Sequence, residues 1–165
     1  TLGTKITILS DTHCYSWSEV DHQIRRAVMQ ADLAIHCGDI VRLPVLEGFR
    51  KCSKRSIAVH GNSDPVELKE TLPYTELIEI EGLRLGITHP AWGREEFPPT
   101  ELFNDFKEKP DIIIFGHTHQ PLFETIEETL FVNPGQGYKS FMVDSTIAQL
   151  NLENRSIKGE IITIK

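Results

Sequence analysis

Near the start of the chain, the segment Lys5-Ile6-Thr7-Ile8-Leu9 is followed directly by Ser10-Asp11-Thr12-His13. The first five residues are mostly apolar and β-branched, which favours a buried β-strand. The next four are polar, so we expect the strand to end there and to present Asp11 and His13 at its C-terminal end. The same unit, a predicted strand followed by a polar cluster, recurs along the chain and indicates the fold class.

The first half of the chain alternates predicted strands with predicted helices. Residues 33–35 and 56–59 form apolar runs typical of strands. A helix is predicted from apolar residues at helical spacing over 20–31, with Ser16 and Glu19 as a capping box before it, and a short helix is predicted over 44–49. This βαβ alternation predicts a parallel sheet covered on both faces.

The second half of the chain contains more hairpins. Residues 76–80 and 83–87 flank a turn at Glu81-Gly82, a helix is predicted over 100–107, and a buried strand over 111–115. From residue 122 onward, hairpins follow one another. We therefore predict an α/β fold in which residues 1–165 form a single domain, with a two-layer mixed β-sandwich core flanked by helices.

A polar cluster follows each of five predicted strands. Because ligands bind at the carboxyl ends of strands in open α/β sheets, we expect these clusters to lie together. They supply two carboxylates, an amide oxygen and four imidazoles, which are too many ligands for one tetrahedral zinc and suit two metals that share a carboxylate. Such a pair of metals activates water and stabilises both oxygens in a displacement at phosphorus, so the pattern predicts phosphoester hydrolysis. The candidate ligands are Asp11, His13, Asp39, Asn62, His89, His117 and His119.

These segments resemble the five signatures of the calcineurin-like metallophosphoesterases, in the expected order. The quoted motifs are Asp11-x-His13, Gly38-Asp39, Gly61-Asn62-x-Asp64, His89 and Gly116-His117-x-His119. The short chain and Asn133-Pro134-Gly135 resemble the small prokaryotic phosphodiesterase branch of that family.

The resemblance implies a role for each of these residues. Asp11, His13, Asp39 and His119 would bind a first metal, and Asn62, His89 and His117 would join a bridging Asp39 on a second. Asp39 and Asn62 would be the catalytic residues, with Asn62 near the substrate phosphate, and Asp64 would hold a loop or a ligand in place. The implied reaction is hydrolysis of a small phosphodiester by a metal-bridging hydroxide. The expected cofactors are two divalent ions, Mn, Ni, Zn or Fe, with Mn favoured.

Two positions depart from the family pattern. Ser63 stands where many relatives carry the His that protonates the leaving group, and Ala91 replaces a second His after His89. We therefore expect weak activity, biased toward substrates with good leaving groups.

Composition limits the alternatives. The formal net charge is −7 and no basic stripe is present, which argues against a dedicated nucleic-acid module and hence against a nuclease. No apolar run is long enough to span a membrane, and three cysteines without a close pair favour the reducing cytoplasm. The exposed edges of the predicted hairpins would permit pairing between copies of the chain, in a homodimer or homotetramer. A scaffold without activity, similar to the small subunit of the eukaryotic retromer coat, is the alternative function.

The other chemically notable side chains are expected to be structural. His22 is predicted to be solvated, while His36 and His60 are predicted to lie in the core or to point away from the site. Cys14 could add a soft ligand or only shape its loop, and Trp92 could line the substrate pocket or only pack.

Overall fold

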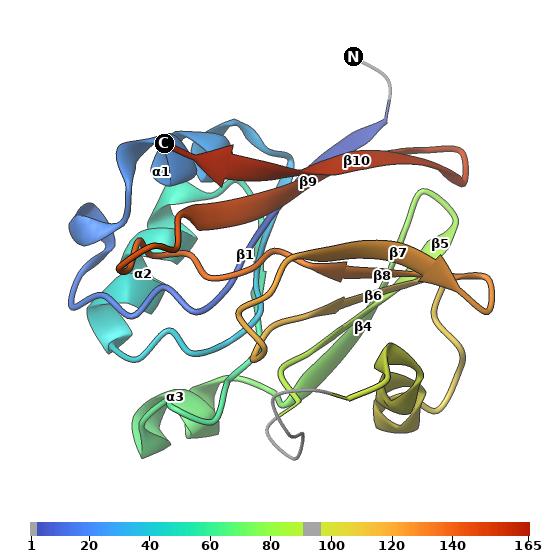
Figure 1. The fold of residues 1–165 in the computed structure, drawn as a ribbon, viewed down its shortest axis with the longest axis horizontal. Coiled ribbons are helices and arrows are strands. Elements are labelled where there is room, and N and C mark those ends of the chain that lie inside the picture. Colours follow the sequence, from blue (N-terminus) through green and yellow to red (C-terminus); the bar gives the residue numbers. More distant parts are fainter. Residues whose placement is uncertain (1–2, 91–96) are drawn as a thin grey trace.

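The computed structural model describes residues 3–90 and 97–165, and in these stretches the chain forms two five-stranded β-sheets packed face to face (Figure 1). The first sheet has the order β10-β9-β1-β2-β3 and the second the order β4-β5-β6-β8-β7. The strands of the first sheet are β1 (Thr4–Leu9), β2 (Leu33–His36), β3 (Ser56–Ala58), β9 (Ser145–Glu153) and β10 (Ser156–Ile164). Those of the second are β4 (Thr75–Ile80), β5 (Leu83–Thr88), β6 (Ile112–Phe115), β7 (Leu122–Ile126) and β8 (Thr129–Asn133).

Both sheets are mixed, with a parallel centre. Strands β1, β2 and β3 pair in parallel, as do β5, β6 and β8, while the β9–β10 and β4–β5 hairpins and β7 pair antiparallel. The predicted two-sheet α/β architecture is therefore confirmed. The antiparallel strand β9 pairs with β1 in the first sheet, although it comes after all the strands of the second.

Helices cover the outer faces of the two sheets. Helices α1 (His22–Gln30), α2 (Leu43–Cys52) and α3 (Val66–Thr71) pack on the first sheet, and the 3₁₀ helix η2 (Pro99–Asp105) packs on the second. A further 3₁₀ turn, η1 (Trp17–Glu19), precedes α1. None of the helices in the described stretches is long and apolar enough to cross a membrane.

Three apolar clusters hold these layers together. The largest lies between the sheets and includes Ile6, Ile8, Leu85 and Ile112. The second joins the first sheet to its helices, and the third joins the second sheet to η2. Burial of apolar area at roughly 25 cal/mol per Å² is the main favourable term in such a fold. The strand ends that carry the polar clusters are therefore positioned by tightly packed layers.

Some predicted helix boundaries were wrong. The Glu19 carboxylate does accept the backbone N–H of Ser16 at 3.0 Å, but this contact closes η1 and not the following helix. Helix α1 has its own N-cap, Asp21, whose Oδ1 accepts the N–H of Gln23 at 2.8 Å. The segment predicted as a helix over 100–107 is η2, which begins with Pro99 directly after Pro98, and the helix predicted over 44–49 extends across Leu43–Cys52.

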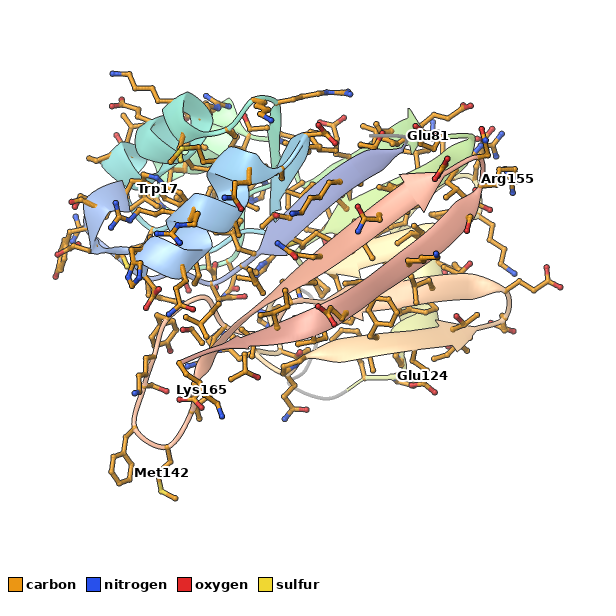
Figure 2. All side chains as sticks on the ribbon, turned by 90° about the horizontal axis from the view of Figure 1, so that it is seen from above. Trp17, Glu81, Glu124, Met142, Arg155 and Lys165 are labelled. Carbon is orange, nitrogen blue, oxygen red and sulfur yellow. The ribbon has the colours of Figure 1, made fainter. Side chains whose placement is uncertain are left out.

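The two sheets are also joined at one end by their turns. The N–H of Arg155, in the β9–β10 turn, donates to the carbonyl of Glu81 in the β4–β5 turn at 3.0 Å. Figure 2 shows these two residues side by side at one end of the molecule. The hydroxyl of Thr4, at the start of β1, also donates to Oε1 of Glu81 at 3.2 Å. The opposite end of β1 leads into the polar cluster.

Candidate metal centre

The polar side chains converge where β1, β2 and β3 of one sheet and β5 and β6 of the other come to an end. Asp11, Asp39 and Asn62 follow strands of the first sheet, while His89 and His117 follow strands of the second. The candidate site therefore spans both sheets.

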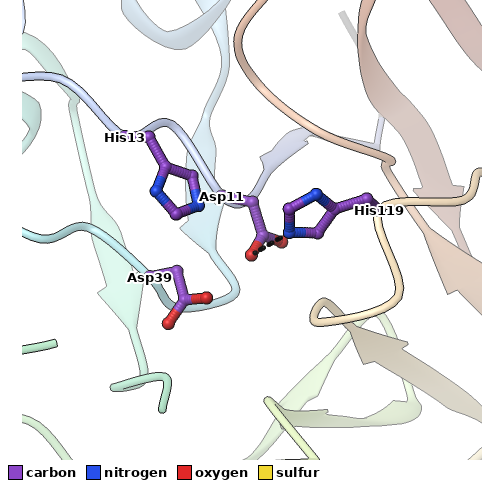
Figure 3. A group of neighbouring side chains, drawn as sticks. All are labelled: Asp11, His13, Asp39 and His119. Carbon is purple, nitrogen blue, oxygen red and sulfur yellow. Dashed lines mark ion pairs between the residues drawn. The ribbon is translucent and has the colours of Figure 1, made fainter. Parts of the chain in front are cut away.

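The first group contains four candidate ligands. One donor atom from each of Asp11, His13, Asp39 and His119 lies within 4.8 Å of the others (Figure 3). Oδ1 of Asp11 is buried and lies 3.2 Å from Nε2 of His119. Burial of a carboxylate is costly, and a bound cation would offset that cost.

The second group also adjoins Asp39. Oδ1 of Asn62 lies 2.9 Å from Nε2 of His89 and 3.1 Å from Nδ1 of His117. Nε2 of His89 is also 3.4 Å from Oδ2 of Asp39. Asp39 therefore contacts members of both groups, and all seven residues singled out in the sequence lie in one cluster.

The orientation of His89 is set by the backbone. Its Nδ1 lies 2.7 Å from the carbonyl oxygen of Cys37 and donates a proton to it, which leaves Nε2 facing Asp39 and Asn62. Metal-binding histidines are commonly fixed in this way by the ring nitrogen that does not bind the metal.

The pKa values of the cluster reflect its mutual contacts. Burial by itself raises the pKa of Asp39, but the hydrogen bond with His89 and its charge outweigh this and hold the pKa well below its usual value. Burial lowers the pKa of His89, and the Asp39 contact more than reverses this. The Asp11 contact raises the pKa of His119. Because metals bind neutral imidazole, a bound metal would oppose these raised pKa values.

Backbone strain is concentrated in the same place. Non-glycine residues rarely adopt positive φ angles, and each costs about 1–3 kcal/mol unless the surroundings enforce it. Five of the seven candidate ligands have such angles, namely Asp11 (53°), His13 (45°), Asp39 (55°), His117 (82°) and His119 (63°). Strain of this kind marks functional sites, because packing retains it where ligand direction matters.

Two glycines allow the loops to approach one another. A Cβ on Gly61 would lie 2.2 Å from Oδ1 of Asp39, and one on Gly116 would lie 2.2 Å from Oγ of Ser10. Any larger residue would push the candidate ligands apart. This explains why glycine precedes Asn62 and His117.

Asp64 lies behind the candidate ligands and holds two loops together. Its carboxylate accepts the backbone N–H of Asp39 at 3.1 Å, of Gly61 at 2.7 Å and of Val41 at 2.6 Å. These three bonds tie the loop of Asp39 to the loop of Gly61.

His36 is buried, as predicted, but it also links the loops that carry Asp11 and Asp39. Its Nδ1 accepts the N–H of Gly38 at 3.2 Å, so Nε2 carries the proton and donates to Oγ1 of Thr12 at 3.1 Å. Burial lowers the pKa of His36 to about 4, against the opposing effect of the nearby carboxylates. The ring is therefore neutral at physiological pH. The apolar setting of its strand could not reveal this role.

Tyr138 is a site neighbour that the sequence did not indicate. Its ring packs edge-on against His13, with centroids 5.0 Å apart, and against His119 at 6.2 Å. It follows Gly137, whose N–H donates to the carbonyl of Ser10 at 2.7 Å. The only signal nearby was Asn133-Pro134-Gly135, which belongs to the same loop; there Asn133 donates to Oγ1 of Thr118 at 2.9 Å.

The other described candidates lie outside the cluster. Sγ of Cys14 donates to the carbonyl of Thr12, and burial and Glu19 raise the pKa of the thiol. His22 is solvated and His60 packs against Tyr74. Ala91 and Trp92 lie outside the described residues.

Carboxylate, amide and imidazole donors in this arrangement fit divalent transition-metal ions. The model of the calcineurin-like phosphoesterase superfamily domain matches residues 4–155, and the chain belongs to this superfamily.

Individual proteins agree with this assignment. The chain is 33% identical to a phosphodiesterase of Methanocaldococcus jannaschii over 180 residues, covering 96% of this chain and 99% of that protein. A solved Thermotoga maritima protein has a TM-score of 0.75 at 30% identity, covering 98% of this chain and 99% of that one. Vacuolar Protein Sorting 29 from Cryptosporidium parvum has a TM-score of 0.78 at 15% identity over 99% of each chain, which is a likeness of fold alone.

Proposed function

We propose that this chain is a hydrolase that cleaves a small phosphodiester at a centre of two divalent metal ions. The observation that carries the proposal is Asp39, whose carboxylate lies beside three further candidate ligands of the first group and beside the three of the second. Membership of the phosphoesterase superfamily and similarity to an archaeal phosphodiesterase support the reaction class.

The two groups of side chains define which residues would hold each ion. Asp11, His13 and His119 would hold one, Asn62, His89 and His117 the other, and Asp39 would contact both. When bound, the ions would activate water as the nucleophile and offset the charge that develops at phosphorus. Mn²⁺ is our first choice, because imidazole and carboxylate oxygen together suit it, although the same donors suit Ni²⁺, Zn²⁺ and Fe²⁺.

The protein's own groups position the substrate more than they transfer protons. Asn62 is exposed at the mouth of the cluster, where its amide can contact a phosphate oxygen. The neighbouring Ser63 is exposed and donates its backbone N–H to Oδ1 of Asp39 at 2.8 Å, and its side chain is a poor acid. Leaving groups that depart without protonation should therefore be cleaved fastest.

The alternative is a protein-interaction scaffold. The likeness to Vacuolar Protein Sorting 29 is a specific reason to consider it, since one fold can carry unrelated functions. Complete donor groups and strained ligand backbones favour the enzyme, because a scaffold has no need of either. A cytoplasmic location and a homodimer or homotetramer also belong to the proposal.

The test is a metal add-back assay. The protein is stripped with chelator and assayed with bis(p-nitrophenyl) phosphate while Mn²⁺, Ni²⁺, Zn²⁺ or Mg²⁺ is returned. We expect metal-dependent turnover that Asp39→Asn abolishes. Asp32→Asn is the matched control, because Asp32 is exposed and only accepts the N–H of Lys5. Two metals bound per chain with no turnover would support the scaffold, and no metal bound would refute the centre.

A further inference from the structure

A small cavity of about 130 Å³ adjoins the candidate metal centre. It is lined by His13, Cys14, Tyr15, Val41 and Arg42. One water molecule needs only roughly 10–15 Å³ of such space, so a tetrahedral oxyanion would fit. Because the candidate ligand His13 forms one wall, a group bound in the cavity would lie directly beside the reacting phosphate.

Arg42 supplies the charge in this cavity. Its guanidinium carbon lies 4.7 Å from the centre of the Tyr15 ring. Two other arginines pair with carboxylates, Arg84 with Glu108 at 3.1 Å and Arg155 with Asp111 at 3.7 Å. No such carboxylate partner is found for Arg42 within residues 3–90 and 97–165. Stacking holds the plane of a guanidinium and leaves its N–H edge free for an oxyanion.

The backbone before Arg42 is strained. Val41 has a φ of 76°, which is an outlier for a β-branched residue. The short hydrogen bond of 2.6 Å from its N–H to Oδ1 of Asp64 helps to hold it there. The same carboxylate accepts the N–H of Asp39, so the position of Arg42 is coupled to the candidate metal ligands. Strain that is enforced next to a site indicates that the direction of the following side chain matters.

We propose that Arg42 and Tyr15 form a subsite for a second phosphate group on the substrate. The proposal rests on the proposed phosphodiesterase function and names its substrate class, a phosphodiester whose alcohol carries a further phosphate monoester. The charge of the scissile phosphate would be offset by the metals, whereas a second phosphate needs its own cation. In a chain of net charge −7, a guanidinium beside the centre that has no carboxylate partner among the described residues meets that need.

Two chromogenic substrates that differ by one phosphate test this subsite. They are the p-nitrophenyl ester of thymidine 5′-phosphate and the same ester carrying a 3′-phosphate. We expect kcat/KM to be about tenfold higher for the 3′-phosphorylated substrate, the factor expected from one hydrogen bond to a charged group. Arg42→Gln should remove the preference and Arg42→Lys should keep part of it. Arg50→Gln, an exposed arginine in the last turn of α2, should leave the preference intact.

A binding measurement separates this proposal from the proposed function. Calorimetry with metal-free protein in chelator should detect thymidine 3′,5′-bisphosphate, with affinity at least tenfold weaker for Arg42→Gln. If binding persists but neither substrate turns over with any metal, the phosphodiesterase proposal fails and the subsite stands. If both substrates turn over equally and Arg42→Gln changes neither rate ratio nor binding, the subsite is refuted and the enzyme stands. If both thymidine esters turn over faster than bis(p-nitrophenyl) phosphate by the same factor, the subsite is also refuted. Base stacking on Tyr15 would then explain the faster turnover.

Discussion

The substitution Asp64→Ala should strongly destabilise the metal-free protein. Asp64 is 4% exposed, and its carboxylate accepts three backbone N–H groups from two different loops. A hydrogen bond to a charged group contributes about 1.5–3 kcal/mol, and a buried donor left without a partner costs about 1–3 kcal/mol. The three bonds share one carboxylate and water can enter the space left behind, so the costs do not add fully. We expect a loss of about 3–5 kcal/mol in the free energy of unfolding.

The assay is urea unfolding followed by tryptophan fluorescence, with metal binding measured separately by calorimetry. Asp32→Ala is the matched control, because that exposed carboxylate accepts a single backbone N–H, from Lys5 at 2.8 Å. It should cost under about 1 kcal/mol. Asp64→Ala should also weaken metal binding, since Asp39 and Asn62 lose their common support. If Asp64→Ala unfolds within 1 kcal/mol of the control and binds metal normally, the supporting role is refuted.

Three further outcomes are expected. The pKa of His36 is about 4 in the folded protein and about 6.5 in the unfolded chain, so between these pH values only the unfolded chain binds the extra proton. The free energy of unfolding of the metal-free protein should therefore fall by up to about 3 kcal/mol as pH falls from 6.5 to 4. This loss should be absent in His36→Gln and unchanged in His22→Gln, as urea titrations at several pH values would reveal. Ser63→His should raise turnover of alkyl phosphodiesters by about 10²-fold while changing bis(p-nitrophenyl) phosphate little, and equal gains on both would contradict a role in protonating the leaving group. Each metal ion at a hundredfold excess over its Kd should stabilise the protein by about 2.7 kcal/mol and raise Tm by roughly 5–10 °C, so two ions should roughly double both effects. Calorimetric scans that show the same shift for Asp39→Asn would place the metal elsewhere.

Much of the fold could be predicted because its signals are local. The apolar run before Asp11 and the Glu81-Gly82 turn both have strong patterns within a few residues, and both predictions were confirmed. The helix ends were harder, since Ser16 and Glu19 close a 3₁₀ turn with the contacts expected of a capping box. Over as few residues as Pro99–Asp105, the apolar spacing of a 3₁₀ helix cannot be told from that of a short α-helix.

The candidate site was visible for a different reason. Each of the seven side chains follows a strand, and strand ends converge in this class of fold whatever the details of the loops. Tyr138 was not visible, because it reaches His13 through a loop fastened to Ser10 by a contact between distant parts of the chain. His36 was judged by its strand alone, and its link between Thr12 and Gly38 depends on two loops meeting.

The turn contacts between Glu81 and Arg155 lie at the end of the sandwich opposite the candidate metal centre. They join the two sheets at the end where β5 begins, whereas the candidate ligands join them where β1 and β5 finish. Removing metal should therefore loosen the end where β1 and β5 finish, where contacts such as that of His89 with the Cys37 carbonyl remain, and leave the other end unchanged. Amide hydrogen exchange should then quicken near Leu9 and Thr88 while the Glu81 turn keeps its protection.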